Sequence, residues 1–324
     1  MERIKFITDS ACDIPVEIAN GYDIDIVPLT VTVDGATYRE AYDLTPEEFY
    51  KLCDSCKELP KSAGASIDGY IRRFEAAWQE GYDQVCVVCI NSQGSVTYSS
   101  ACHARDAFFE EHPDARPRLG IEIVDSRTYS IAYGLPVLAA SRMHRAGAKL
   151  SEILTYMADW FDRVEIYFAP LTFDFVKRSG RVSGTAAFVG EALGIRPIVS
   201  IIEGKTHTAA TVRGDSKIIG GFLKIFQERC QKDSPYGILV GTVGEMAREM
   251  SQKLEALTGQ APACIYQAGP AITINGGPKL LAFCFLSKEP RGQSGLIEKL
   301  QSSVQSAEEA VSGLLKKVHE KLER

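Results

Sequence analysis

The sequence predicts an α/β protein, and three observations support this class. Short apolar runs such as 4–8 and 85–90 have the length and composition of buried parallel strands. Segments with helical spacing follow these runs, so strand and helix alternate through the first half of the chain. In the second half, neighbouring apolar runs lack an intervening helix. We therefore expect a three-layer α/β/α N-terminal domain with a mostly parallel sheet, and an α/β C-terminal domain with a mixed sheet.

The composition and net charge restrict the classes of protein to which the chain can belong. The chain has 324 residues, of which 45% are hydrophobic and 24% charged, so there is enough apolar material for a full core. We expect domains at 1–162 and 163–287, followed by a linker and a C-terminal amphipathic helix over 288–324. A net charge of -6 argues against nucleic-acid binding. Because no apolar run reaches membrane-span length and the N-terminus lacks a signal-peptide pattern, we expect a cytoplasmic protein without a stable membrane anchor.

Local signals place the N-terminal elements. The strand at 4–8 leads into a turn in which Ser10 or Asp13 is expected to cap the short helix after Pro15. A second strand covers 24–33. The signals that follow are a hairpin turn at Asp34-Gly35, a helix start at Thr45-Pro46, a small-residue loop over 60–66 and a helix cap at Ser66.

The stretch 85–101 runs from a strand through a polar turn into a helix start. Gly94 permits close approach of the backbone, and Ser95 and Thr97 supply hydroxyl groups. Because the unpaired N–H groups at a helix start attract anions, this turn is a candidate anion site. The alternative is that Ser95 simply caps its helix, and the residues of this stretch alone favour that interpretation.

The remaining elements follow the same signals. A strand over 121–125 ends at Asp125-Ser126, where ligands of parallel sheets often bind. The rest of the chain is expected to contain helices over 133–145, 150–162, 173–177, 184–193, 216–230, 245–257 and 296–322, and strands over 164–171, 196–203, 206–212, 236–243, 264–268, 271–274 and 280–286.

The sequence contains fragments of metal and nucleotide motifs, but none of them is complete. Two Cys-x-x-Cys pairs suggest a zinc site, but Cys86 and Cys89 lie in a strand, where this spacing places them on opposite faces. Cys53 and Cys56 lie in a helical pattern. The five histidines lack metal-ligand spacing, and no complete P-loop, dinucleotide fingerprint or nucleophile elbow occurs. We therefore expect neither a metal nor a cofactor.

An ordered set of motifs resembles the DegV family, the fatty-acid-binding proteins that include the FakB subunits of bacterial fatty acid kinase. The resemblance covers about residues 4–286 and is much more specific than any one motif. Its pieces are Phe6-Ile7-Thr8-Asp9-Ser10 with Asp13-Ile14-Pro15, Val27-Pro28-Leu29 with Asp34-Gly35 and Tyr38, Ile90–Ala101, Asp125-Ser126, Gly180-Arg181-Val182-Ser183, Ile195-Arg196-Pro197-Ile198 and Val212-Arg213.

The resemblance implies a carboxylate site between two domains. In the family, a Thr in a Thr-Ser-x-Pro-Ser loop and the first Ser of a Ser-Gly-Thr turn hold the fatty acid carboxylate. The matching residues here are Ser62 and Ser95, and the backbone N–H of Val96 or Thr97 would assist them. The acyl chain would occupy an apolar tunnel lined from both domains. This implication agrees with the anion site expected from the residues themselves.

The chain departs from the family pattern at four places. Ala65 replaces the loop proline, Val96 replaces a glycine, and Arg178-Ser179 stand where a glycine pair is usual. Asn275 occupies the position of a histidine that often precedes Gly-Pro-Gly in the family. Asparagine keeps hydrogen bonding but cannot titrate, so the coupling of this chain to a kinase is left open.

Three functional hypotheses follow. The leading one is a long-chain fatty-acid-binding protein that presents its ligand to a separate ATP-dependent fatty acid kinase. In this hypothesis, Arg181, Arg196 and Arg213 are candidates for phosphate or kinase contact, and ordinary ion pairing is their alternative role. The second is a hydrolase or transferase that uses Ser95 or Ser62 on an acyl substrate. The third is a regulatory protein whose C-terminal helix binds a partner.

Overall fold

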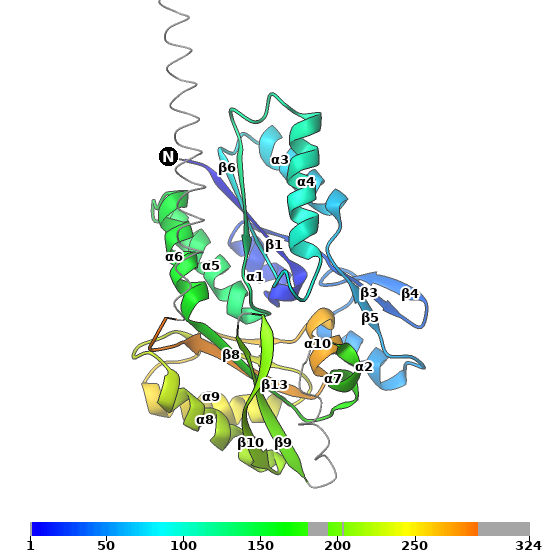
Figure 1. Ribbon diagram of the computed structural model, residues 1–324, viewed down its shortest axis with the longest axis vertical. Helices are drawn as coiled ribbons and strands as arrows, with labels where there is room; N and C mark the ends of the chain where they lie inside the picture. The colour runs from blue at the N-terminus through cyan, green and yellow to red at the C-terminus, as the bar shows by residue number, and fades with distance from the viewer. Residues whose placement is uncertain (1, 181–193, 203, 291–324) are drawn as a thin grey trace, which may run out of the picture.

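The computed structural model describes residues 2–180, 194–202 and 204–290, and the strands of these ranges form three sheets (Figure 1). The first sheet is parallel throughout. Its strand order is β2 (Ile24–Val27), β1 (Ile4–Asp9), β6 (Gln84–Cys89) and β7 (Gly120–Asp125). Because the central strands are covered on both faces, β6 is apolar along almost its whole length.

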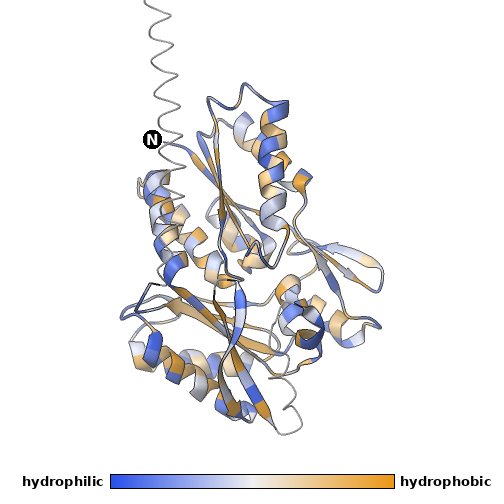
Figure 2. Cartoon of the chain, in the orientation of Figure 1, coloured by the Kyte–Doolittle hydropathy of each residue, from blue (hydrophilic) through white to orange (hydrophobic). Residues whose placement is uncertain are grey.

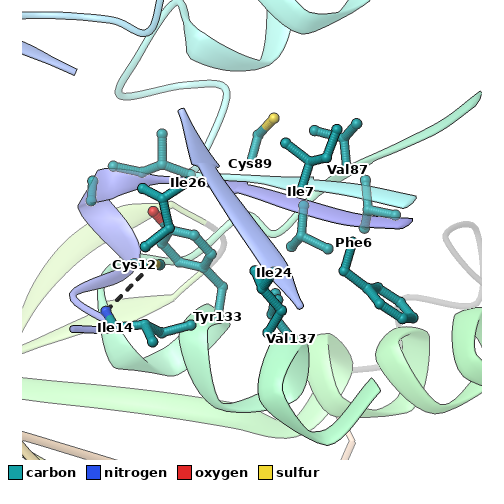
Figure 3. Close-up of a cluster of buried hydrophobic side chains, with 14 of the residues drawn as sticks. Phe6, Ile7, Cys12, Ile14, Ile24, Ile26, Val87, Cys89, Tyr133 and Val137 are labelled. Carbon is teal, nitrogen blue, oxygen red and sulfur yellow. Dashed lines mark hydrogen bonds between the residues drawn. The ribbon is translucent and has the colours of Figure 1, made fainter. Parts of the chain in front are cut away.

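Helices cover both faces of the first sheet. The helices α3 (Ile67–Gln79) and α4 (Thr97–Glu111) pack on one face, α1 (Val16–Gly21) and α5 (Ile131–Arg145) pack on the other, and α6 (Leu150–Arg163) packs on α5. Figure 3 shows Tyr133 and Val137 of α5 beneath the strands that carry Phe6 and Ile24. The predicted three-layer α/β/α arrangement is confirmed.

The second sheet is mixed, as predicted. Its pairs are antiparallel except for the last one in the order, which is parallel. The order is β10 (Lys205–Arg213), β9 (Ile195–Ile202), β8 (Val164–Pro170), β13 (Leu280–Leu286), β11 (Tyr236–Val240) and β12 (Cys264–Gln267). The last strand of the described residues, β13, therefore lies in the middle of the sheet.

The two faces of the second sheet have different neighbours. Tyr167, Phe283 and Phe285 face the helices α8 (Ile218–Arg229) and α9 (Gly244–Thr258) and form an aromatic core with them. Because side chains alternate along a strand, Phe168 and Ala282 lie on the opposite face. Figure 2 shows hydrophobic residues along the strands of both sheets, with hydrophilic residues on the outer helices.

The helix α5 belongs to the packing of both sheets. It contacts β1 and β6 of the first sheet and β8, β11 and β13 of the second. Trp160 of α6 donates a 2.8 Å hydrogen bond to the carbonyl of Ala132, which fixes the outer side of α5. One continuous cluster of buried side chains accordingly runs from Phe6 to Cys284. The helix α5 precedes residues 162–163 in the sequence but packs against the second sheet, whose strands follow them. The proposed domain division at 162–163 therefore stays a prediction.

The third sheet is small and antiparallel, with the order β4 (Ala36–Arg39), β3 (Thr30–Val33) and β5 (Lys61–Ala63). The predicted hairpin turn is confirmed, since Asp34 and Gly35 both have positive φ angles, 46° and 85°. The prediction of a small-residue loop over 60–66 is wrong for residues 61–63, which form the strand β5. Residues 61–63 pair with the edge of β3, and this long-range pairing has no local sequence signal.

The helix starts at Thr45 and Ser66 are confirmed. Thr45 and Glu48 form a capping box at the start of α2 (Pro46–Ser55). Ser66 accepts a 3.1 Å hydrogen bond from the N–H of Gly69 in α3. The expected cap of α1 is wrong, because Pro15 occupies the cap position without a side-chain hydrogen bond.

A second wrong prediction concerns 271–274, which was expected to be a strand. These residues belong to the helix α10 (Pro270–Gly276), which begins at a proline and packs against α7 (Asp174–Ser179) and β5. The apolar run at 271–274 is too short to show whether its hydrophobic residues repeat with the period of a helix or of a strand. The sequence therefore does not distinguish the two structures here.

Other predictions lie outside the described residues. These are the helices over 184–193 and 296–322, and Arg181. Within the described ranges, no helix is long and apolar enough to cross a membrane, and no group of three or more metal-ligating side chains could hold an ion.

Candidate functional site

The residues between β6 and α4 form a rigid turn, Asn91–Val96, here called the serine turn. The N–H groups of Gly94 and Ser95 both donate to the Asn91 carbonyl at 3.1 Å. Ser92 donates through its hydroxyl and its N–H to Asp125, at 2.5 and 3.0 Å. The second Asp-Ser motif thus fixes the turn, because Asp125 ends the neighbouring strand of the parallel sheet.

Ser95 does not cap α4 in the predicted way. The helix begins at Thr97 with Val96 as its cap residue and without a side-chain cap. Ser95 instead accepts a 3.2 Å hydrogen bond from the Thr97 N–H, and its Oγ lies 2.9 Å from the Thr97 Oγ1. Serine hydroxyls make such local bonds in turns. The half-buried Ser95 hydroxyl therefore stands ahead of the helix.

The segment after β5 docks directly onto the serine turn. The N–H of Ala65 donates to Thr97 Oγ1 at 3.2 Å. A Cβ atom on Gly64 would lie 2.7 Å from Cγ2 of Val96 and 3.2 Å from the backbone nitrogen of Thr97. Glycine therefore permits this close approach, which brings Ser62 to the same region as Ser95.

A cavity of about 280 Å³ lies between this region and the second sheet. Its polar contributors include Ser62 and Ser95, and Asn275 adds a side chain from α10. Phe168, Ala282 and Leu239 pair across β8, β13 and β11 and so form one row of its floor. Other apolar lining residues are Leu29, Ile90, Ile166, Ile201, Ala271, Ile272 and Leu280. Ligand cavities commonly combine such an apolar lining with a few polar groups.

A second, more polar hollow adjoins the cavity and is here called the outer depression. It has a volume of about 510 Å³ and includes Lys205, Ser92 and Ser99. The two spaces share Gly94, Ser95, Val96, Tyr129 and Thr206, and these five residues are here called the mouth. Val96 at the mouth has 64% of its surface exposed. The cavity is thus open to polar surroundings on the side of the serine turn.

The structure gathers most of the predicted ligand-binding residues around this cavity. Ser62, Ser95, Val96 and Asn275 all line it. Thr97 lies buried behind Ser95 and does not line it. The Asn275 side chain donates a 2.8 Å hydrogen bond to the Ala271 carbonyl of its own helix.

Two of the predicted arginines, Arg196 and Arg213, lie in the described residues and line neither the cavity nor the outer depression. The Arg196 side chain forms a 2.5 Å ion pair with Asp215 and lies over the Phe173 ring, which are the contacts expected for its alternative, ion-pairing role. Arg213 is exposed on β10 and contributes to neither the cavity nor the outer depression.

Sequence reasoning missed Tyr129 and Ser130, which follow the second Asp-Ser motif. Asn91 donates to the Tyr129 hydroxyl at 2.7 Å, and a Cβ on Gly94 would overlap that hydroxyl. Ser130 has a positive φ of 57°, which is rare for serine. The cluster of polar residues after Asp125 was the available signal, but its contact with Gly94 depends on the folded arrangement.

The hydroxyl groups of Ser62 and Ser95 have no general base beside them among the described residues, whereas the Ser130 hydroxyl, which also lines the cavity, donates to the buried carboxyl of Asp13. In the described part of the chain, Ser95 pairs with Thr97, and no histidine or carboxylate hydrogen-bonds to Ser95 or Ser62. An activated serine needs a general base within hydrogen-bond reach. Among the described residues, Ser62 and Ser95 are therefore placed as hydrogen-bonding groups without a neighbouring base.

Comparison of the sequence with models of known protein families identifies the family of this chain. A family model described as "Uncharacterised protein, DegV family" matches residues 3–288. The chain belongs to the DegV family. A DegV domain-containing protein of Caldanaerobacter subterraneus is 34% identical over 219 residues, which cover 68% of this chain and 75% of the relative. Another, from Listeria monocytogenes, is 27% identical over 286 residues, 88% of this chain and 99% of the relative.

Several solved structures, two of them described as DegV proteins, share the fold. A Thermus thermophilus DegV protein described as binding fatty acid has a TM-score of 0.76 at 27% identity, and the match covers 88% of this chain and 99% of that protein. A Thermotoga maritima protein described as a DegV lipid-binding protein has a TM-score of 0.75 at 27% identity, with 90% and 100% covered. A protein of Eubacterium ventriosum reaches a TM-score of 0.80 at 23% identity, with 89% and 99% covered.

Proposed function

We propose that this DegV protein binds one long-chain fatty acid in the cavity, with the carboxylate at the mouth. The hydroxyl groups of Ser62 and Ser95 and the N–H of Val96 or Thr97 would hold the carboxylate, and Asn275 would lie beside it. The observation that carries the proposal is an apolar cavity that meets polar surroundings at the serine turn. The fatty acid and lipid binding described for the Thermus and Thermotoga relatives supports it.

The two ends of the ligand would contribute differently. Each methylene buried against the floor of the sheet contributes about 0.8 kcal/mol, so the tail supplies most of the affinity. A hydrogen bond to a charged group contributes roughly 1.5–3 kcal/mol and depends on direction. The serine hydroxyls would therefore set the orientation of the ligand and distinguish an acid from an ester.

We further propose that the protein carries its ligand in the cytoplasm and does not transform it. A separate ATP-dependent fatty acid kinase is the proposed partner, and the open mouth gives such a partner access to the carboxylate. Exposed Arg213 is a proposed partner contact, and so is Arg181, which lies outside the described residues. The ion pair of Arg196 with Asp215 makes Arg196 the weakest candidate of the three. Asn275 would have to support this step by hydrogen bonding alone.

The deciding experiment is mass spectrometry of small molecules released by denaturing the protein purified without added lipid. We expect one fatty acid per chain. A protein that is empty and takes up none of a panel of long-chain fatty acids would overturn the proposal. Turnover of acyl esters that disappears in Ser95→Ala would assign a serine-dependent hydrolase instead.

Binding measurements on variants test the residues. We expect Ser62→Ala and Ser95→Ala each to weaken fatty acid binding about tenfold, because each removes one charge-assisted hydrogen bond. Binding of the methyl ester should change little in both variants. Ser100→Ala in α4, which lines neither space, is the matched control. Equal affinity of wild type and the Ser62→Ala Ser95→Ala double variant would remove both serines from the site.

A further inference from the structure

Three carboxyl groups lie together in the core, and the proposed binding function does not use them. Asp9 ends β1, Asp13 follows the short turn after β1, and Glu40 follows β4. Their exposed fractions are 0%, 7% and 1%. None of the ion pairs in the described ranges includes any of the three, which are here called the carboxylate cluster. Burying a charged carboxylate without a cation costs folding free energy, and the hydrogen bonds of this cluster offset part of that cost.

Glu40 connects two walls of the cavity. Its Oε1 accepts a 2.6 Å hydrogen bond from the Ala271 N–H in the first turn of α10, and its Oε2 accepts one of 2.5 Å from the Ser10 hydroxyl. Ser10 Oγ in turn accepts from the Leu29 N–H at 2.8 Å. Leu29 and Ala271 both line the cavity. A single carboxylate thus joins the β2–β3 connection to α10 across the ligand site.

The other two carboxyl groups hold further parts of the wall. Asp13 accepts from the Ser130 hydroxyl and, at 2.7 Å, from the Gly269 N–H at the start of α10. Asp9 accepts from the Ile90 N–H at 2.8 Å and from the Tyr133 hydroxyl at 2.6 Å. Ser130 and Ile90 also line the cavity. Four lining residues on four segments are therefore fixed by the carboxylate cluster.

The titratable groups that face the cluster are neutral. They are Cys12 beside β1, Tyr50 of α2, Tyr70 of α3, Cys89 of β6, Tyr133 of α5 and Cys264 of β12, whereas α10 contributes none. Burial raises the pKa of each of these thiols and phenols, so they do not take up the negative charge. The carboxyl groups alone carry any change of charge in this region.

Burial also raises the pKa of the carboxyl groups. It raises the pKa of Glu40 to about 7 and that of Asp9 to about 6, and it raises the pKa of Asp13 well above its ordinary value. Glu40 and Asp9 therefore change charge close to neutral pH, and the three carboxyl groups titrate as a coupled unit. When Glu40 takes up a proton, one of its oxygens becomes a donor, and the bond from Ala271 or Ser10 loses its charge-assisted character.

We infer that Glu40, together with Asp13, positions the cavity wall for ligand binding, so that ligand affinity follows the charge state of Glu40. This inference rests on the proposed binding function. Ionised Glu40 holds α10 and Leu29 in the arrangement of the cavity, and a bound acyl chain packs against the same two walls. By reciprocity, ligand binding then favours the ionised form of Glu40 and releases a proton.

The test measures the dissociation constant of a C16 alkyl sulfonate at pH 8.0, 7.0 and 5.5. The sulfonate head stays anionic over this range, so changes in affinity report on the protein, and the C16 fatty acid is measured in parallel. For wild type we expect sulfonate affinity at pH 5.5 to be at least about fivefold lower than at pH 8.0. Glu40→Gln should bind more weakly than wild type at pH 8.0 and should show a smaller change of affinity between pH 8.0 and 5.5, because only Asp9 and Asp13 still titrate in the cluster.

Two controls separate positioning from other effects. Glu47→Gln removes a carboxylate from the exposed face of α2 and should keep the wild-type profile. Ser95→Ala should bind more weakly at every pH and keep the same pH dependence, since it acts at the mouth. A wild-type pH profile in Glu40→Gln would overturn the inference.

A second measurement needs no variant and remains decisive where Glu40→Gln fails to fold. Calorimetry of sulfonate binding to wild type at pH 7.0, in two buffers of different ionisation enthalpy, should show net proton release. Equal heats in both buffers, or equal affinity at pH 5.5 and 8.0, would overturn the inference and leave the binding function intact. A wild-type protein that binds neither the sulfonate nor the fatty acid at any pH would overturn the proposed function itself.

Discussion

At the scale of single residues, the floor of the cavity is shaped by one small side chain. Ala282 lies between Phe168 and Leu239 in a row of paired residues. The mouth includes Thr206 on β10, whereas Ala282 and Leu239 lie on the fourth and fifth strands of the sheet. Ala282 therefore lies far from the mouth, where the end of an acyl chain would rest.

Enlarging this residue should shorten the longest chain that fits. We expect Ala282→Leu to weaken binding of C18 fatty acids by at least about tenfold and that of C12 by less than twofold, because added methyl groups fill the far end of the cavity. Competition binding across a C10–C20 series measures the shift. Leu281→Met on the opposite face of β13 is the control, and an unchanged chain-length profile in Ala282→Leu would contradict this placement of the tail.

At the scale of elements, the site depends on close contact between segments that come from different strands. The serine turn, β5 and the polar segment after β7 meet because glycines leave room at two places. At Gly94, the space that a Cβ atom would need is filled by the Tyr129 hydroxyl, which also accepts a hydrogen bond from the Asn91 side chain.

This contact predicts a specific rescue. Gly94→Ala should displace the Tyr129 ring and weaken fatty acid binding several-fold, because the new Cβ overlaps the phenol oxygen. Gly94→Ala combined with Tyr129→Phe should recover part of the lost affinity, since the overlapping atom is gone. A double-mutant cycle on ligand affinity measures the coupling. Purely additive losses would show that the two residues do not share this space.

The ionisation of the carboxylate cluster should also be visible in folding stability. The folded pKa values of Glu40 and Asp9, about 7 and about 6, exceed those of the unfolded chain, so the folded state binds more protons between about pH 4 and 7. This contribution to stability is present at acidic pH and is lost as pH rises through the folded pKa values. We expect the urea midpoint to be higher at pH 6 than at pH 8.

The variant Glu40→Gln should reduce that difference and raise the urea midpoint at pH 8, while Glu47→Gln leaves both values unchanged. A midpoint that is lower at pH 6 than at pH 8 in wild type would contradict the assigned direction. Glu40 would then lower folding stability at neutral pH while it fixes the wall of the ligand cavity. Functional sites often show such an exchange of stability for function.

Prediction from sequence succeeded where the signal is local and failed where tertiary contacts decide. The strands around Val87, the cap at Ser66 and the turn at Asp34 follow from neighbouring residues. The pairing of residues 61–63 with β3 and the helix at 270–276 do not, because both runs are short and take their structure from distant partners. Ser62 and Ser95 were identified through their motifs, whereas Glu40 stands in no motif that predicts contact with α10.

At the scale of the whole molecule, α5 makes the two large sheets one packing unit. A continuous hydrophobic cluster includes residues of both, although their strands occupy separate halves of the sequence. The chain contains two tryptophans, Trp78 and Trp160, and both precede the second sheet. Their fluorescence therefore reports on the first sheet and its helices.

This arrangement predicts cooperative unfolding. Phe283→Ala removes a fully buried ring from the second sheet and should cost about 3–5 kcal/mol. We expect the urea transition seen by tryptophan fluorescence to shift to lower urea, because the damaged sheet supports α5. A tryptophan transition that is unchanged while circular dichroism shows an earlier one would indicate two independent domains divided near 162–163.

The position of β13 also has a consequence for synthesis. This strand pairs with β8 and β11 at the centre of the second sheet, yet it follows both in the chain by many residues. At about 5–20 residues per second, roughly 6 to 25 s separate the emergence of β8 from that of β13. Through this interval the inner edge of β8 lacks its partner, as does that of β11 once it has emerged, and α5 lacks its contacts with β13. The nascent chain is therefore most vulnerable to aggregation just before β13 emerges.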